Sequence, residues 1–281
     1  MKLSPQADVF VPDALGGPEA FSRTTHLGIG AHQDDLEFMA FHGILACYDQ
    51  TDHWFGGVIL TDGRGSSRLG VYRDWTDAQM AAERVQEQRR AATLGQYSFV
   101  AQLGYASEDV RLKQAEASRT EILSILNATR PKVVYVHNLA DKHDTHVGCA
   151  LRCIEALRLL PRDQRPEKVY GCEVWRDLDW LVDDEKTPMP ISGRPELAQQ
   201  LNAIFATQIA GGKRYDLAVL GRRTANATFS NAHSSDRETS MQWAMDLTPL
   251  IQDDTLDPLT YVTGFVDRLK SDITARIRRS L

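Results

Sequence analysis

The feature that most constrains this chain is a repeated alternation of short apolar stretches with helical patterns. The clearest stretch is KVVYVH, which follows Pro131 and is typical of a buried strand. Four others share this character: THLGIGA (25–31), GGVILT (56–61), YSFVAQL (97–103) and KVYGCEVW (168–175). Apolar strands that alternate with helices are typical of a mostly parallel sheet with helices on both faces. We therefore predict an α/β fold.

Between these strands, apolar residues recur at helical spacing. We predict helices over about 36–47, 76–94, 116–129 and 147–157, the second of them ending at Gly95. Beyond residue 177 the pattern loosens. There we predict a helix over 195–207, a strand at YDLAVLG (215–221) and a last helix whose apolar stripe, from Val262 to Ile277, packs back on the body. The first twenty residues are expected to be irregular. We predict a single domain over 1–281, with a core at about 25–176 and a decorated C-terminal part at 177–281.

The composition narrows the class of protein. The 281 residues carry 32 basic and 38 acidic side chains, so the formal net charge is −6, which gives no general support for nucleic-acid binding. The four cysteines lack metal-site or disulfide-framework spacing. With no apolar leader and no run of membrane-spanning length, we expect a cytoplasmic protein without a membrane span. The oligomeric state stays open, and a homo-oligomer is compatible with the sequence.

Two segments more than ninety residues apart carry histidine and aspartate in dense clusters. GIGAHQDDLEF holds His32, Asp34 and Asp35, and HNLADKHDTH holds His137, Asp141, His143, Asp144 and His146. Imidazole and carboxylate are preferred ligands of zinc-type ions. Both segments follow a predicted strand and precede a predicted helix, so they reach the same edge of a parallel sheet, where such folds bind ligands. The sequence therefore predicts a metal-dependent enzyme.

At these motifs a family resemblance becomes plain. AHQDDLE resembles the A-H-P-D-D-x-E signature of the PIG-L/LmbE-like zinc-dependent de-N-acetylases, and HDTH at 143–146 resembles their H-P-D-H motif in its outer histidines. TDGRGS and RVQEQRRAATLG are similar to the family's Gly-rich loop and to the helix that follows it. The resemblance covers about residues 25–160. It implies a Rossmann-like fold and hydrolysis of an N-acetyl group, usually on an N-acetylglucosamine unit.

Carried over by position, the resemblance implies one Zn²⁺ held by His32, Asp35 and His146, although another divalent metal could occupy the same ligands. It also implies Asp34 as general base and His143 as the group that stabilises the oxyanion or protonates the leaving amine. The simpler alternative for Asp34 or Asp35 is that one of them caps a helix.

The second motif departs from the family pattern. Asp144 and Thr145 stand where the family has proline and aspartate. We expect Asp144 or Asp141 to supply the missing carboxylate, although Asp144 could equally be a simple helix cap. His137 is expected to support the site rather than to bind the metal.

Substrate contacts are expected from two regions. Arg64 and Arg68 lie in the polar loop after the second predicted strand, where a substrate could be reached. The stretch from Gly211 to Asp236 mixes planar polar groups with aromatic rings and suits the rim of a sugar site, with an ordinary surface loop as the alternative.

The leading hypothesis is a zinc-dependent N-deacetylase acting on an N-acetylglucosamine-type sugar or glycoconjugate. A metal hydrolase of another amide or ester and a catalytically silent sugar-binding protein are the alternatives.

Overall fold

One eight-stranded sheet forms the centre of the chain in the computed structural model, which describes residues 2–113 and 115–281. The strands lie in the order β1-β4-β3-β2-β5-β6-β8-β7. The five inner strands from β4 to β6 pair in parallel, whereas β1, β8 and β7 join antiparallel. The strand bounds are β1 Asp8–Phe10, β2 His26–Gly30, β3 Phe55–Thr61, β4 Phe99–Tyr105, β5 Val133–His137, β6 Lys168–Cys172, β7 Thr187–Pro190 and β8 Met241–Asp246.

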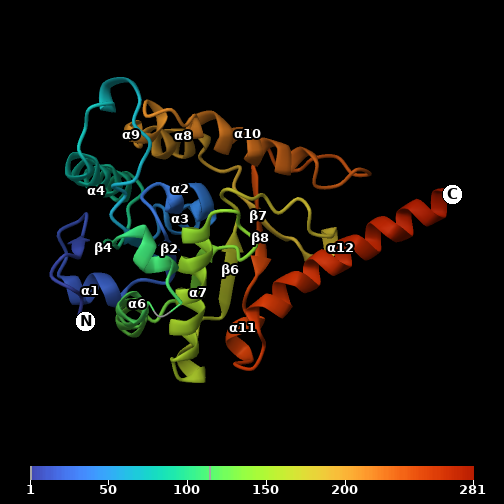
Figure 1. Ribbon diagram of the computed structural model, residues 1–281, viewed down its shortest axis with the longest axis horizontal. Coiled ribbons are helices and arrows are strands. Elements are labelled where there is room, and N and C mark those ends of the chain that lie inside the picture. The colour runs from blue at the N-terminus through green and yellow to red at the C-terminus, as the bar shows by residue number, and fades with distance from the viewer. Residues whose placement is uncertain (1, 114) are drawn as a thin grey trace.

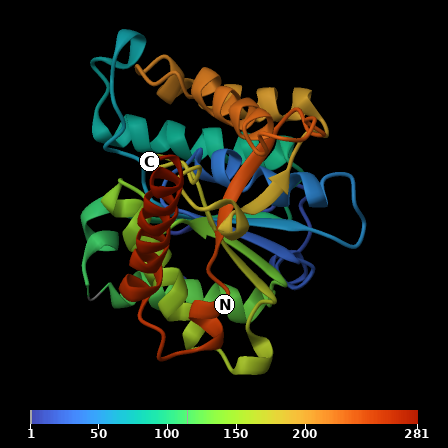
Figure 2. The same cartoon turned by 90° about the vertical axis from the view of Figure 1, so that its right-hand side faces the viewer.

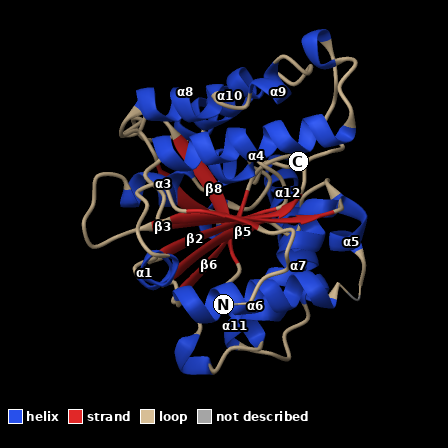
Figure 3. Cartoon of the chain, turned by 90° about the vertical axis from the view of Figure 1, so that its left-hand side faces the viewer, coloured by secondary structure: helices blue, strands red, loops and turns tan. Residues whose placement is uncertain are grey.

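Helices cover both faces of this sheet (Figures 1 and 3). One face carries α1 Gly17–Ser22, α5 Ser107–Arg111, α6 Glu116–Thr129, α7 Asp144–Arg158 and α11 Pro249–Gln252. The other carries α2 Asp35–Met39, α3 Phe41–Cys47, α4 Asp77–Leu94, α8 Pro195–Ala203, α9 Ala206–Ile209 and α10 Tyr215–Thr228. The last helix is α12 Pro258–Ser280, and three short 3-10 turns lie at Gly70–Tyr72, Arg162–Gln164 and Asp183–Glu185.

Each face of the sheet has its own apolar core, because successive side chains of a strand point to opposite faces. In β5, Val134 and Val136 pack with the α6 and α7 side, and Tyr135 packs with the α2 and α3 side. All three side chains are fully buried. This explains why the inner strands are apolar along their whole length, and it confirms the predicted α/β fold with a mostly parallel sheet.

The structure also corrects several expectations. The lead-in is not wholly irregular, since it contains β1 and α1. YDLAVLG is not a strand but the start of α10, where Tyr215, Ala218, Val219 and Arg222 recur at helical spacing. The strands β7 and β8 lie in regions where none was expected. The division into a core and a decorated part of a single domain stays a prediction.

The last helix is amphipathic, as expected, but only its first part packs on the body. Phe265 is buried, whereas Ile273 and Ile277 are about half exposed (47% and 55%). In Figures 1 and 2, α12 runs from α11 away from the sheet towards the C-terminus. The expectation that its whole apolar stripe packs back is therefore wrong for the second half of the helix. Within the described ranges, none of the helices combines the length and apolarity needed to cross a bilayer.

Candidate metal centre and cavity

The two histidine–aspartate segments meet at the topological switch point of the sheet. The order of the strands reverses between the neighbours β2 and β5, because β3 and β4 lie on one side of this pair and β6 lies on the other. In open parallel sheets such a switch point opens a crevice beyond the carboxyl ends of the strands. The first segment follows β2 and the second follows β5.

A tight turn after β2 presents two adjacent aspartates in different directions. Asp34 lies in the left-handed region at φ 85°, which aspartate tolerates better than most residues, and it precedes the first residue of α2, Asp35. A Cβ placed on Gly30 would lie only 3.0 Å from the Asp35 Cβ, so this glycine lets Asp35 fold back over the strand end. The backbone N–H of His32 donates to the Asp35 carboxylate at 2.6 Å, which fixes that carboxylate within the turn.

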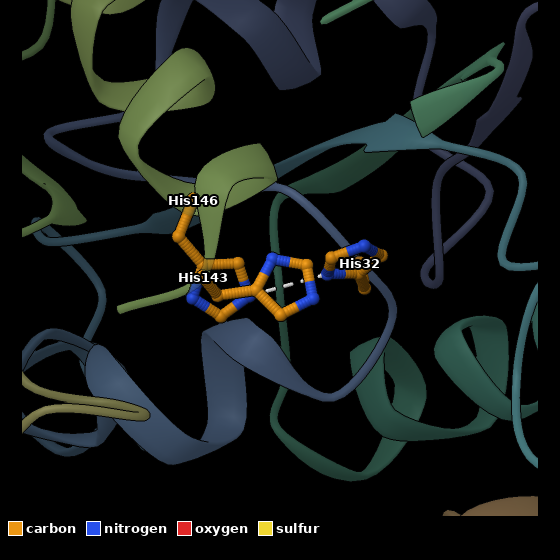
Figure 4. A group of neighbouring side chains, drawn as sticks. All are labelled: His32, His143 and His146. Carbon is orange, nitrogen blue, oxygen red and sulfur yellow. Dashed lines mark hydrogen bonds between the residues drawn. The ribbon is translucent and has the colours of Figure 1, made fainter. Parts of the chain in front are cut away.

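The imidazole rings of His32, His137 and His146 lie against Asp35, and a fourth ring, that of His143, lies against His146. Nδ1 of His32 lies 3.2 Å from Nε2 of His146, as the dashed line in Figure 4 marks. The ring of His143 stacks on that of His146 with centroids 4.4 Å apart, and the His137 ring stacks on His146 at 3.8 Å. His143 and His146 come from the start of α7, and His32 comes from the turn after β2.

The donor atoms of His32, Asp35 and His146 have the spacing that a tetrahedral zinc ion needs. Zinc bonds of about 2.0–2.1 Å place neighbouring ligand atoms roughly 3.3 Å apart. Here the two ring nitrogens are 3.2 Å apart. Asp35 Oδ2 lies 3.4 Å from His32 Nδ1, and the other oxygen of that carboxylate, Oδ1, lies 3.5 Å from His146 Nε2. His143 also brings a ring nitrogen within 4.8 Å of those of His32 and His146. The residues present therefore fit a divalent cation.

The protonation states of His146 and Asp35 also favour metal binding. Burial lowers the pKa of His146 to about 3, so its ring is neutral at pH 7. Burial would raise the pKa of Asp35, but the imidazoles of His146 and His137 outweigh it and hold that pKa well below the ordinary value. A neutral imidazole beside an ionised carboxylate is the form in which both residues bind metals.

Asp141, rather than Asp144, lies against the histidines. Its Oδ2 lies 3.3 Å from Nδ1 of His146, and its Oδ1 accepts the backbone N–H of His143 at 3.1 Å. Asp144 is exposed in the first turn of α7, where an acidic side chain stabilises a helix N-terminus. His137 is fully buried, and its Nε2 accepts the backbone N–H of Ala31 at 3.0 Å, so it ties β5 to the turn after β2.

Asp141→Asn is expected to weaken metal affinity by about 10- to 100-fold, because carboxylates that orient a ligating imidazole have effects of that size. The matched control is Asp144→Asn, which changes the same functional group three residues away on the exposed side of α7. Competition of each variant with a chromogenic zinc chelator gives the affinities. Equal affinities for the two variants would remove Asp141 from its supporting role.

Arg84 is the buried cation nearest to Asp34. It comes from α4 and is 1% exposed, and its two terminal nitrogens each lie 3.3 Å from Asp34 Oδ2. Burial raises the pKa of Asp34 well above its ordinary value, and the positive charge of Arg84 opposes that rise. Gln88, one helical turn further along α4, accepts the Asp34 backbone N–H at 3.2 Å. The helix α4 therefore holds the carboxylate in place.

A cavity of about 450 Å³ opens over this cluster. It is lined by the site residues His32, Asp34, Asp35, His143 and His146 together with Arg84. Its outer wall adds residues that were not singled out individually as substrate contacts, among them Trp175, Gln208, Lys213 and Tyr215. The last three belong to or border the stretch whose composition suggested a sugar rim. Trp175 follows β6 and carried no recognisable signal in the sequence.

The two loop arginines lie beside this cavity. Gly63, Gly65, Ser66 and Ser67 contribute to its wall, but Arg64 and Arg68 are not among the described residues that line it. Arg64 forms an ion pair with Asp62, and Arg68 donates to Asp77 at 2.6 Å. Their role in substrate binding stays a prediction, which requires both side chains to leave these partners.

Solved structures share this fold at low sequence identity. The N,N'-diacetylchitobiose deacetylase from Pyrococcus horikoshii is 15% identical, with 85% of this chain and 89% of that chain covered and a TM-score of 0.60. A conserved protein from Thermus thermophilus is 18% identical over 83% and 98%, with a TM-score of 0.59. The 4-carboxy-2-hydroxymuconate hydratase from Pseudomonas putida is 16% identical over 80% and 95%, with a TM-score of 0.57.

The chain is therefore an α/β protein whose fold these solved structures share, with a histidine–aspartate cluster at the switch point of its sheet. A family comparison is more specific. Residues 27–157 match the sequence model of the PIG-L family, which is described as GlcNAc-PI de-N-acetylase. This range contains every residue of the cluster and both strands that carry it, apart from the first residue of β2.

Proposed function

We propose that this chain is a zinc-dependent hydrolase that removes the N-acetyl group from an N-acetylglucosamine-type sugar or glycoconjugate. The observation that carries the proposal is the convergence of His32, Asp35 and His146 beside Asp34 in one cavity. A silent sugar-binding protein would have no need of a buried carboxylate next to three metal-type donors. The match of residues 27–157 to the PIG-L family model and the deacetylase among the structural neighbours support the same class of reaction.

The roles of the residues follow from their positions. His32, Asp35 and His146 would hold the metal, which when bound activates water and polarises the amide carbonyl. Asp34 is the carboxylate that takes the proton from the attacking water, because it lines the cavity without belonging to the three proposed ligands. Arg84 and Gln88 keep it in place.

His143 occupies the side of the cavity towards Trp175, with ring centroids 6.1 Å apart. Burial lowers the pKa of His143, but it is only half-buried and remains open to the cavity. It is placed to donate a hydrogen bond to the developing oxyanion or a proton to the departing amine.

The fold alone leaves the reaction open, since a hydratase shares it. A hydrolase of another amide or an ester is therefore the second candidate. The decisive assay measures acetate and free amine released from N-acetylglucosamine monomers, oligomers, lipid conjugates and thiol conjugates. The same panel includes acetate esters of comparable size.

We expect stoichiometric acetate and amine, activity lost after a chelator has stripped the metal, and activity restored by Zn²⁺, Co²⁺ or Mn²⁺. The control is a chelated sample returned to metal-free buffer. Full turnover by protein shown to be metal-free by mass spectrometry would exclude the metal mechanism. Release from esters alone would favour the second candidate.

A further inference from the structure

A second cavity of about 280 Å³ adjoins the first. The two cavities share four wall residues: Phe38, Val174, Trp175 and Tyr215. The aromatic rings of this shared wall contact one another, with centroids 5.3 Å apart for Phe38 and Tyr215 and 6.1 Å apart for Trp175 and Tyr215. The two cavities are therefore neighbours, with these three aromatic rings in their common wall.

One wall of the second cavity is a face of α10 that begins at the shared residue Tyr215. Tyr215, Ala218, Val219 and Arg222 lie at positions i, i+3, i+4 and i+7 of this helix, and all four line the cavity. The aromatic rings, Val174, Ala218 and Val219 supply most of the exposed lining. The polar side chains of Glu173, Arg223 and Gln242 also line the cavity, but they are almost fully buried. Lys142 lies at the exposed edge, and the Arg222 guanidinium donates to the Val174 carbonyl oxygen.

We infer that this second cavity binds an apolar alkyl or aryl group carried by the amino sugar as its aglycone. The inference rests on the proposed deacetylase function and specifies its substrate class. The first cavity, at about 450 Å³, has room for the sugar itself. The second cavity is therefore available to the aglycone of that sugar. The wall of the second cavity is half-exposed and partly aromatic, so an apolar group that covers it is removed from water. Each methylene buried in this way contributes about 0.8 kcal/mol to the free energy of binding.

The test compares methyl, hexyl and phenyl β-glycosides of N-acetylglucosamine with the metal-loaded full chain. We expect kcat/KM for the hexyl and phenyl glycosides to exceed that for the methyl glycoside by about 10- to 100-fold. Calorimetric binding of the deacetylated hexyl product provides a readout without turnover. The same preference for hexyl over methyl is expected there.

Two cavity-filling variants, Val219→Trp and Ala218→Trp, are expected to reduce the hexyl-to-methyl ratio in both readouts to near 1. Ala218 is already exposed, so a large side chain there has room to fold. The matched control is Thr224→Trp, which places the same ring on the exposed side of α10 and is expected to keep the ratio.

The possible outcomes separate the inferred role of the second cavity from the proposed function. Methyl-glycoside turnover with no preference for hexyl or phenyl overturns the inference and leaves the proposed function standing. A ratio lost equally in Thr224→Trp also overturns it, because the effect would not be specific to the cavity. If no N-acetyl compound is turned over, the proposed function fails, and binding of the hexyl product then tests the cavity alone.

Discussion

Asp34→Asn is expected to retain its metal and to lose about 10²- to 10⁴-fold in kcat for acetate release, the usual contribution of a positioned general base. The amide has nearly the shape of the carboxylate and can still accept from Arg84, but it cannot take a proton from water. Metal content by mass spectrometry, measured on the sample used for kinetics, separates loss of the base from loss of the metal.

The matched control is Glu37→Gln, which makes the same change at a buried carboxylate close by in the same segment. Glu37 accepts from Gln88 at 2.8 Å and from Tyr97 at 2.6 Å, and it does not line the cavity among the described residues. We expect this variant to keep its kcat. An Asp34→Asn variant with wild-type turnover would show that the base is another group.

His146→Ala is expected to lose metal and activity together. Within the described ranges, two groups of donor atoms lie close enough together to hold a cation: His32, His143 and His146, and Asp35, His137 and His146. His146 belongs to both groups, and its side chain is 1% exposed. Removing it takes away one nitrogen ligand and leaves the carboxylates of Asp35 and Asp141 without their shared neighbour. Equilibrium dialysis against dilute zinc, followed by metal analysis, gives the stoichiometry.

The control for this variant is His53→Ala, which removes an exposed imidazole that pairs with Asp52, away from the cavity. It is expected to bind one zinc ion per chain, as the wild type does. Zinc at one equivalent in His146→Ala, with activity intact, would contradict the ligand assignment.

Much of the inner sheet was predictable because strands that are buried on both faces are apolar along their whole length. KVVYVH is apolar since Val134 and Val136 face one core and Tyr135 faces the other. The meeting of the two histidine–aspartate segments was predictable for a related reason, because parallel strands deliver whatever follows them to one edge of the sheet.

Other parts depend on tertiary packing that no local pattern encodes. Seven residues such as YDLAVLG fit a strand or a helical turn equally well, and contacts with β8 and α8 accompany the helix that forms. Arg84 lies far along the chain from Asp34, and only the placement of α4 over the turn brings the two together. Trp175 reaches the cavity from a loop without any motif.

The chain's four cysteines are all buried as free thiols. Burial raises the pKa of Cys47 and Cys153 to about 12. Thiol reagents react with the thiolate, so we expect these two cysteines to react very slowly in the folded protein. Leu281 follows α12 and is fully exposed. A dye should therefore label a Leu281→Cys variant without prior replacement of the native cysteines. The protein is therefore suited to site-specific labelling of this helix with its native cysteines in place.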